Sequence, residues 1–182
     1  MDSDVLLWMV FHRVAWLTTV FWVITTLGNT LWVFVWATAG CSALVVSGRR
    51  VEAVMVAGAM LTGWAAMGLA KLLFGRVRPP VPERLVVIES HSFPSGHAMM
   101  SALAATVAIA VMLRSATPWL RRGSLLAVPV AASLAIGVSR IYLGAHWVTD
   151  VLAGWLFGAA WGLLWIYGFR GVSGRRSHFA VR

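Results

Sequence analysis

The sequence predicts an all-α fold, a polytopic bundle of transmembrane helices, and three observations lead to this prediction. The 182-residue chain is 60% hydrophobic and only 12% charged, whereas about a quarter of a soluble globular domain is charged. Stretches without charge recur at lengths close to the roughly 20 residues that a helix needs to cross a bilayer. They cover residues 14–48, 53–70, 98–113, 123–139 and 151–169. Basic residues gather between and after these stretches.

The first 29 residues are predicted to form an N-terminal apolar helix. Residues 5–27 are apolar enough to span the membrane, but His12 and Arg13 lie among them. Because a charged arginine inside hydrocarbon is costly, we favour a helix lying in the interface over a sixth span. The acidic start, from Met1 to Asp4, does not fit a cleavable signal peptide.

Five firm spans are expected after this segment, within the core 30–169. They are placed at 30–48, 53–74, 95–113, 124–141 and 147–169. Prolines 79, 80 and 82 exclude a helix from 79–93, which we expect to be an outer loop. Residues 170–182 form a basic tail, and the whole chain, 1–182, is expected to be a single membrane-embedded domain.

The distribution of arginine predicts the orientation of the bundle. One set of helix ends carries Arg49, Arg50, Arg114, Arg121, Arg122, Arg170, Arg175, Arg176 and Arg182. The positive-inside rule places these ends in the cytoplasm, together with the C-terminus. We therefore expect a multi-pass protein of the cell membrane. Although the net charge is +9, this distribution favours anionic lipid as the partner and argues against nucleic acid.

Three polar clusters interrupt the apolar sequence, and the predicted topology places all three at the extracytoplasmic helix ends. The first runs from Lys71, the chain's one lysine, to Arg78-Pro79. The second is Pro94-Ser95-Gly96-His97, and the third is Ser139-Arg140 followed by His146 and Asp150. Charge beside a membrane span usually marks function.

The residue types in these clusters are those that phosphoryl transfer requires. His146 and Asp150 are four apart, so on a helix the carboxylate can fix the imidazole tautomer and leave the other nitrogen as nucleophile or base. Ser95 opens a span whose first N–H groups can bind an anion, and Gly96 allows close approach. His97 can donate a proton at the rim. The alternative for both segments is ordinary helix capping.

The cations are expected to neutralise phosphate charge. Lys71 and Arg78 are seven apart, two helical turns, and can point the same way, whereas Arg76 is interpreted as off that face and solvated or lipid-facing. The alternative for Lys71 and Arg140 is snorkelling to the interface. Six scattered carboxylates cannot build a two-metal phosphatase centre, so we expect no metal site.

These motifs resemble those of the type 2 phosphatidic acid phosphatase superfamily. The signature K-x6-RP, PSGH and SR-x5-H-x3-D is matched by Lys71 to Pro79, Pro94 to His97, and Ser139 to Asp150. The resemblance implies that His146 forms a phosphohistidine, oriented by Asp150, and that His97 protonates the leaving oxygen. It further implies phosphate contacts from Lys71, Arg78, Ser95, Gly96 and Arg140, with no cofactor.

The resemblance implies a metal-independent lipid phosphatase, similar to compact members that act on polyprenyl pyrophosphates. Polyprenyl pyrophosphate, phosphatidylglycerol phosphate and phosphatidic acid are the candidate substrates. A lipid-to-lipid phosphotransferase using the same phosphohistidine is an alternative. A non-catalytic anion transporter or scaffold is a weaker alternative, because the His146, Asp150 and His97 set is intact. The soluble vanadium haloperoxidases share the signature, but this chain is far too apolar for them.

Overall fold

The computed structural model describes residues 2–80, 84–86 and 88–179, the last ten of these by their backbone alone. These residues form seven α-helices and one short 3₁₀-helix, with no strand among them. The helices are α1 Asp2–Phe11, α2 Ala15–Leu27, α3 Thr30–Val46, α4 Arg50–Phe74, α5 Gly96–Leu113, α6 Gly123–Tyr142 and α7 Val148–Phe179, with the 3₁₀-helix at Pro118–Arg121. The all-α prediction is confirmed.

Among the described residues, four helices, α4 to α7, are each long and apolar enough to cross a membrane. A fifth candidate is the pair α2 and α3, which meet at a bend of 53°. The bend falls at Gly28-Asn29, where the Asn29 side chain accepts the N–H of Trp32 at 3.0 Å and caps α3. The predicted spans therefore agree closely with α3 to α7.

The expected single helix over residues 5–27 is instead two short helices, separated at His12 to Val14. The break lets Arg13 reach α6, where its Nε and Nη2 donate to the Tyr142 carbonyl at 2.9 and 2.8 Å. This carbonyl lies at the C-terminus of α6, where intrahelical donors are lacking. Arg13 is half-buried, and the cost of its partial burial is offset by this helix-end partner. Helices α1 and α2 are each too short to cross a bilayer alone.

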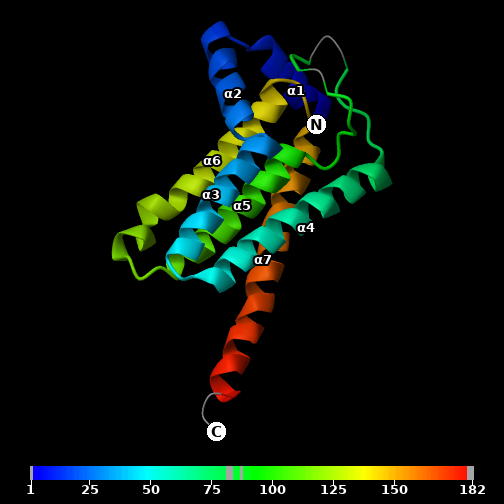
Figure 1. The fold of residues 1–182 in the computed structure, drawn as a ribbon. Coiled ribbons are helices and arrows are strands. Elements are labelled where there is room, and N and C mark those ends of the chain that lie inside the picture. Colours follow the sequence, from blue (N-terminus) through cyan, green and yellow to red (C-terminus); the bar gives the residue numbers. More distant parts are fainter. Residues whose placement is uncertain (1, 81–83, 87, 180–182) are drawn as a thin grey trace.

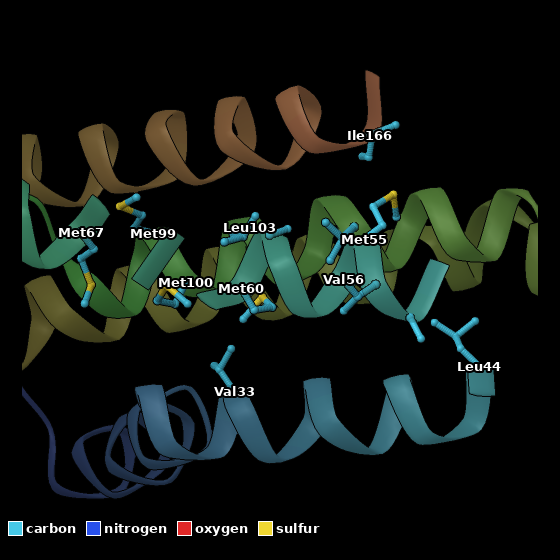
Figure 2. Packing of buried hydrophobic residues seen from close by; sticks show 13 residues of the cluster. Val33, Leu44, Met55, Val56, Met60, Met67, Met99, Met100, Leu103 and Ile166 are labelled. Atoms are coloured by element: carbon cyan, nitrogen blue, oxygen red, sulfur yellow. The ribbon is translucent and has the colours of Figure 1, made fainter. Parts of the chain in front are cut away.

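A methionine-rich core holds α4 and α5 together (Figure 2). Met60 and Met67 of α4 are buried with Met99, Met100 and Leu103 of α5. The other labelled members of this cluster are Val33 and Leu44 of α3, Met55 and Val56 of α4, and Ile166 of α7. Unbranched thioether side chains fill irregular gaps between helices, so this core fixes α4 against α5.

Helices α5 and α7 approach so closely that only glycine fits at their contact. A Cβ built on Gly158 would lie 2.1 Å from the Met99 carbonyl oxygen, and one on Gly154 would lie 2.8 Å from that of Ser95. Gly162 follows at the same four-residue spacing and faces Thr106. Small residues at this spacing let transmembrane helices pack backbone to backbone, and the result is that the N-terminal ends of α5 and α7 are side by side.

The two ends of the bundle carry different elements (Figure 1). Helices α1 and α2 lie at one end with the connection from α4 to α5, and the α3–α4 turn and the α5–α6 connection lie at the other. The backbone of α7 continues to Phe179, so the start of the expected tail extends that helix. The side chains of Arg170, Arg175 and Arg176, and all of Arg182, are outside the described residues.

The glycine contact predicts an asymmetric result for two alanine substitutions in α7. Gly158→Ala should destabilise the protein by about 1–3 kcal/mol, because its methyl group must displace the backbone of Met99. Gly168→Ala is the matched control, since a Cβ there has no neighbour within 4 Å, and it should be neutral or slightly stabilising. Thermal unfolding in detergent measures both, and equal unfolding temperatures for the two variants would contradict the packing argument.

Candidate functional site

The structure brings the three polar motifs together at the end of the bundle where α5 and α7 begin. The Ser95 N–H donates to the Asp150 carbonyl oxygen at 3.0 Å, which joins the second motif to the third. Lys71 Nζ and Arg78 Nη2 both donate to the carbonyl oxygen of His91, at 2.6 and 3.1 Å. All the predicted site segments therefore meet, although they come from α4, α5, α6, α7 and two connections.

Lys71 and Arg78 meet in a different way from the one predicted. Helix α4 ends at Phe74, because Gly75 takes the left-handed conformation with φ +55°. Arg78 is therefore not two helical turns above Lys71 but in the connection that follows α4. It is buried there, with 7% of its surface exposed, and it returns toward the bundle through its contact with His91.

A tight turn sets the spacing between Arg140 and His146. Gly144 has φ +71°, which favours glycine. The N–H groups of Ala145 and His146 both donate to the Arg140 carbonyl oxygen, at 2.9 and 3.2 Å. Five intervening residues thus turn the chain from the last turn of α6 into the start of α7, and His146 is left fully inside the protein.

The imidazole of His146 is held at both nitrogens. Nδ1 lies 3.5 Å from Asp150 Oδ2 and 3.5 Å from Ser92 Oγ, and Nε2 lies 3.0 Å from Arg78 Nη1. Because Arg78 only donates, Nε2 is the accepting nitrogen and Nδ1 carries the proton. A lone pair on Nε2 is what a nucleophilic histidine presents.

Burial sets the charge states of the two groups at this contact. Burial, together with Arg78 and other cations nearby, lowers the pKa of His146 to about 3, despite the opposing effect of Asp150. Burial also lowers the pKa of Arg78, to about 10. At neutral pH the imidazole is thus uncharged and the guanidinium is charged, as a nucleophile facing an anion-binding cation should be.

Asp150 is fully buried and accepts from several elements. Its Oδ2 accepts the Trp147 N–H at 3.1 Å, the helix-start contact that the capping alternative expects, and it also accepts a hydrogen bond from Ser92 Oγ. Asp150 therefore both caps α7 and faces His146. Sequence reasoning missed Ser92, which is fully buried between the two; its position two residues before Pro94 was the available signal.

Arg76 is also part of the site, and its interpretation as solvated or lipid-facing was wrong. Its Nη1 donates to Asp150 Oδ1 at 2.6 Å and its Nη2 to Asp2 Oδ2 at 2.9 Å. The Asp2 carboxylate also accepts from the N–H and hydroxyl of Thr149. Burial acts to raise the pKa of Asp2, but hydrogen bonds from Thr149 and Arg76 outweigh it and lower that pKa. The N-terminal residue of α1 is thus connected to the carboxylate beside His146.

Two polar atoms at the centre of the predicted phosphate site are buried without a hydrogen-bond partner in the described part of the chain. They are Ser95 Oγ and Arg140 Nε, and the third such atom is Arg84 Nε. Ser95 occupies the N-cap position of α5, yet its side chain caps nothing, so the capping alternative does not account for it. Arg140 is 3% exposed, with Nη1 donating to Thr25 Oγ1 at 2.6 Å, so it does not snorkel to the interface. Buried donors that the protein leaves without an acceptor are suited to binding an anion.

His97 and Gly96 complete the set. His97 follows Gly96 in the first turn of α5, within electrostatic reach of Lys71, Arg78, Arg140 and His146, and its ring makes no hydrogen bond with the described residues. A Cβ built on Gly96 would lie 2.7 Å from Met67 Sδ and 3.8 Å from Lys71 Cε. Glycine at this position therefore lets Met67 of α4 pack against the first turn of α5.

Comparison with known families identifies the family of this chain. The profile of the PAP2 superfamily matches residues 52–172, more than half of the chain, and this protein belongs to that family. The matched range contains every predicted site residue.

Two relatives and two solved structures are similar to this chain. Phosphatidylglycerophosphatase B of Bacillus subtilis (strain 168) is 44% identical over 85 residues, 46% of this chain and 41% of the relative. An undecaprenyl-diphosphatase of Sulfolobus acidocaldarius is 35% identical over 70 residues, 38% of this chain and 29% of the relative. The aligned parts thus cover less than half of either relative.

The similarity of the whole fold is more extensive. A crystal structure of a transmembrane PAP2 type phosphatidylglycerolphosphate phosphatase from Bacillus subtilis matches with a TM-score of 0.84 at 26% identity, over 96% of this chain and 85% of that one. LpxE of Aquifex aeolicus matches with a TM-score of 0.74 at 22% identity, over 91% and 94%. The second match shows the fold alone.

The charge state of His146 gives a prediction about pH. Because its pKa is lowered to about 3, the ring should remain neutral at pH 5, where an ordinary histidine with a pKa near 6.5 is mostly protonated. Between about pH 6.5 and pH 3, His146 is protonated in the unfolded chain but not in the folded protein. Protonation therefore favours the unfolded chain, and the free energy of unfolding falls as the pH is lowered through this range.

Ring-nitrogen NMR of histidine-labelled protein measures this, with the His146 signal assigned by its loss in His146→Gln. Arg78→Gln should shift the titration of His146 upward, because it removes a neighbouring cation. A His146 midpoint near pH 6.5 in the unsubstituted protein would contradict the assigned burial.

Arg76 gives a prediction about positioning. Arg76→Gln should lower kcat by about 10- to 100-fold, because the Asp150 carboxylate loses a charged partner and its fixed orientation. Asp2→Asn should act in the same direction but less strongly, since it reaches Asp150 only through Arg76. The double variant should be no worse than Arg76→Gln alone. If the losses of kcat in the two single variants add up in the double variant, or if only KM changes, then Arg76 and Asp2 do not position Asp150.

Proposed function

We propose that this protein is a lipid phosphatase that hydrolyses a phosphomonoester or pyrophosphate of a membrane lipid through a phosphohistidine. The single observation that carries the proposal is the pair of unpartnered buried atoms, Ser95 Oγ and Arg140 Nε, beside a neutral and buried His146. A phosphate group supplies the acceptors that both donors lack. Membership of the PAP2 superfamily and the names of its similar members support a phosphate substrate on a lipid.

The first step is attack on phosphorus by Nε2 of His146. Substrate phosphate oxygens replace that nitrogen as the partner of Arg78 Nη1, which frees the lone pair. The P–N bond forms as the bond to the leaving oxygen breaks, and His97 gives that oxygen its proton. The proton on Nδ1 stays directed toward Asp150 and Ser92, which stabilise the charge that develops on the ring.

The second step restores the enzyme. Water attacks the phosphohistidine, His97 accepts the proton of that water, and inorganic phosphate leaves with His146 neutral again. Lys71, Arg78, Arg140, the Ser95 hydroxyl and the backbone at Gly96 hold the phosphate oxygens throughout, and their stabilisation of the transition state is electrostatic. We propose that the reaction needs no metal or other cofactor, since these cations take the place of a metal centre.

Activity measurements test the mechanism. His146→Ala should abolish phosphate release from lipid phosphates, and His97→Ala should reduce it by about 10² to 10⁴. The loss in His97→Ala should be smallest for substrates with good leaving groups. Activity should persist in excess EDTA. Turnover by His146→Ala within tenfold of the unsubstituted protein would exclude the phosphohistidine, and loss in EDTA restored by Mg²⁺ would exclude a metal-free reaction.

We further propose that the site opens to the extracytoplasmic side of the cell membrane and that the C-terminus is cytoplasmic. The support is geometric: the site lies at the bundle end opposite the turns that carry Arg49, Arg50, Arg114, Arg121 and Arg122 (Figure 1). The positive-inside rule assigns those turns to the cytoplasm. The lipid tail would stay in the bilayer while the phosphate enters laterally between helices near Ser95.

Cysteine labelling in intact cells tests this orientation in a Cys41→Ala background. Glu89→Cys, in the exposed part of the α4–α5 connection, should react with a membrane-impermeant thiol reagent. Ala116→Cys, exposed in the connection before α6, should react only after the cells are opened. Ala116 is a better probe than its neighbour Ser115, which is buried and would resist labelling on either side. The reverse pattern would overturn the proposed sidedness.

A further inference from the structure

A second charged site lies at the opposite end of the bundle from the candidate active site. It is a cavity of about 460 Å³ between the α3–α4 turn, the first turns of α4, the end of α5 and α7. Arg49, Arg50 and Arg114 line it with Glu52, and Met55 and Phe169 form apolar parts of its wall. The motifs of the catalytic cluster contribute nothing to this cavity, so it needs an explanation of its own.

The charge within the cavity is not balanced by the described residues. Arg49 pairs with the Glu52 carboxylate, and its Nη2 also donates to the Val111 carbonyl oxygen at 2.9 Å, so its guanidinium is fixed against α5. Arg114 makes only a weak contact, from Nη1 to Met55 Sδ at 3.8 Å. Arg50 makes no hydrogen bond or ion pair with any side chain that the structure describes, and both it and Arg114 are exposed. Two guanidinium groups on different helices therefore line one cavity without an anionic partner.

The side chains around the cavity suit contact with lipid, because several apolar ones beside it are strongly exposed. Val46, at the end of α3, is 89% exposed, and Leu113, at the end of α5, is 50% exposed. Val51 and Val54, on the first turns of α4, are also exposed. In a transmembrane protein such side chains face acyl chains. A ligand that fits both features is anionic at its head and apolar beyond it.

We propose that this cavity binds the phosphate headgroup of an anionic phospholipid in the membrane leaflet at this end of the bundle. The headgroup phosphate lies between Arg50 and Arg114, whose planar guanidinium groups suit phosphate oxygens. The acyl chains lie along the exposed valines of α3 and α4. Basic pockets between transmembrane helices hold lipid headgroups in this way, and the bound lipid joins the α3–α4 turn to the end of α5. The site does not depend on the proposed phosphatase activity.

Lipid binding to the purified full-length protein in detergent tests the proposal. Phosphatidylglycerol should bind and raise the thermal unfolding temperature, and phosphatidylcholine should do so much less. Arg50→Gln with Arg114→Gln should weaken phosphatidylglycerol binding at least tenfold. The matched control is Arg121→Gln with Arg122→Gln, which removes the same charge from the same end of the bundle but lies outside the cavity. The control should bind within twofold of the unsubstituted protein.

Additional variants and measurements complete this test. Arg50→Gln alone is the variant least expected to disturb folding, since the exposed Arg50 side chain makes no hydrogen bond or ion pair with the described residues. It should weaken binding severalfold. Binding is measured by native mass spectrometry in a His146→Ala background, so that no lipid is turned over at the candidate active site during the measurement. If phosphatidylglycerol binding falls equally in both double variants, the effect comes from general surface charge, and the proposed site is wrong. If inorganic phosphate or glycerol phosphate stabilises the protein as much as phosphatidylglycerol does, the ligand is a soluble anion and the lipid proposal is wrong. Equal binding of phosphatidylglycerol and phosphatidylcholine would also contradict the proposal.

Discussion

The backbone contact between α5 and α7 is the constraint on which the site depends. Gly158 lies against the Met99 carbonyl, and Gly154 against that of Ser95, so the two helices lie closer than side chains would permit. This closeness brings the Ser95 N–H to the Asp150 carbonyl and sets the first turn of α5 beside the start of α7. His97 and His146 belong to these two helix starts, so the separation of the proposed acid and nucleophile is decided by glycines several turns away.

Electrostatics at this end of the bundle favour an anion. Lys71, Arg78 and Arg140 converge around a histidine that burial keeps neutral, while the nearby carboxylate, Asp150, is already paired with Arg76 and Ser92. The positive charge that is left unpaired includes that of Arg78 and Arg140, whose side chains are buried. A phosphate group would satisfy the buried donors and the excess charge together, and in the proposed reaction the same residues would bind the substrate and stabilise charge in the transition state.

The two proposed anion sites, one at each end of the bundle, are built in different ways. At the candidate active site Arg78 and Arg140 are buried. The carbonyl oxygens of Ala145 and Ser90 fix Arg78 at a defined position, and the Thr25 hydroxyl accepts from Arg140. At the other end Arg50 and Arg114 are exposed beside apolar side chains, which suits a lipid that is retained and not transformed. Arg49, paired with Glu52, lines the same cavity.

The sequence by itself determined the class of fold, the core spans and the motif residues proposed for the site. Charge-free runs specify spans because no water solvates a charge in hydrocarbon, and the three motifs specify phosphate chemistry through residue type and spacing. Only the tertiary structure decided how Lys71 and Arg78 meet, because one left-handed glycine at position 75 ends α4 between them. It also decided that residues 5–27 break at Arg13, and that Arg76, Asp2 and Ser92 belong to the site. Each of these depends on a partner distant in the chain, as Asp2 is from Thr149, and local sequence patterns carry no information about such pairings.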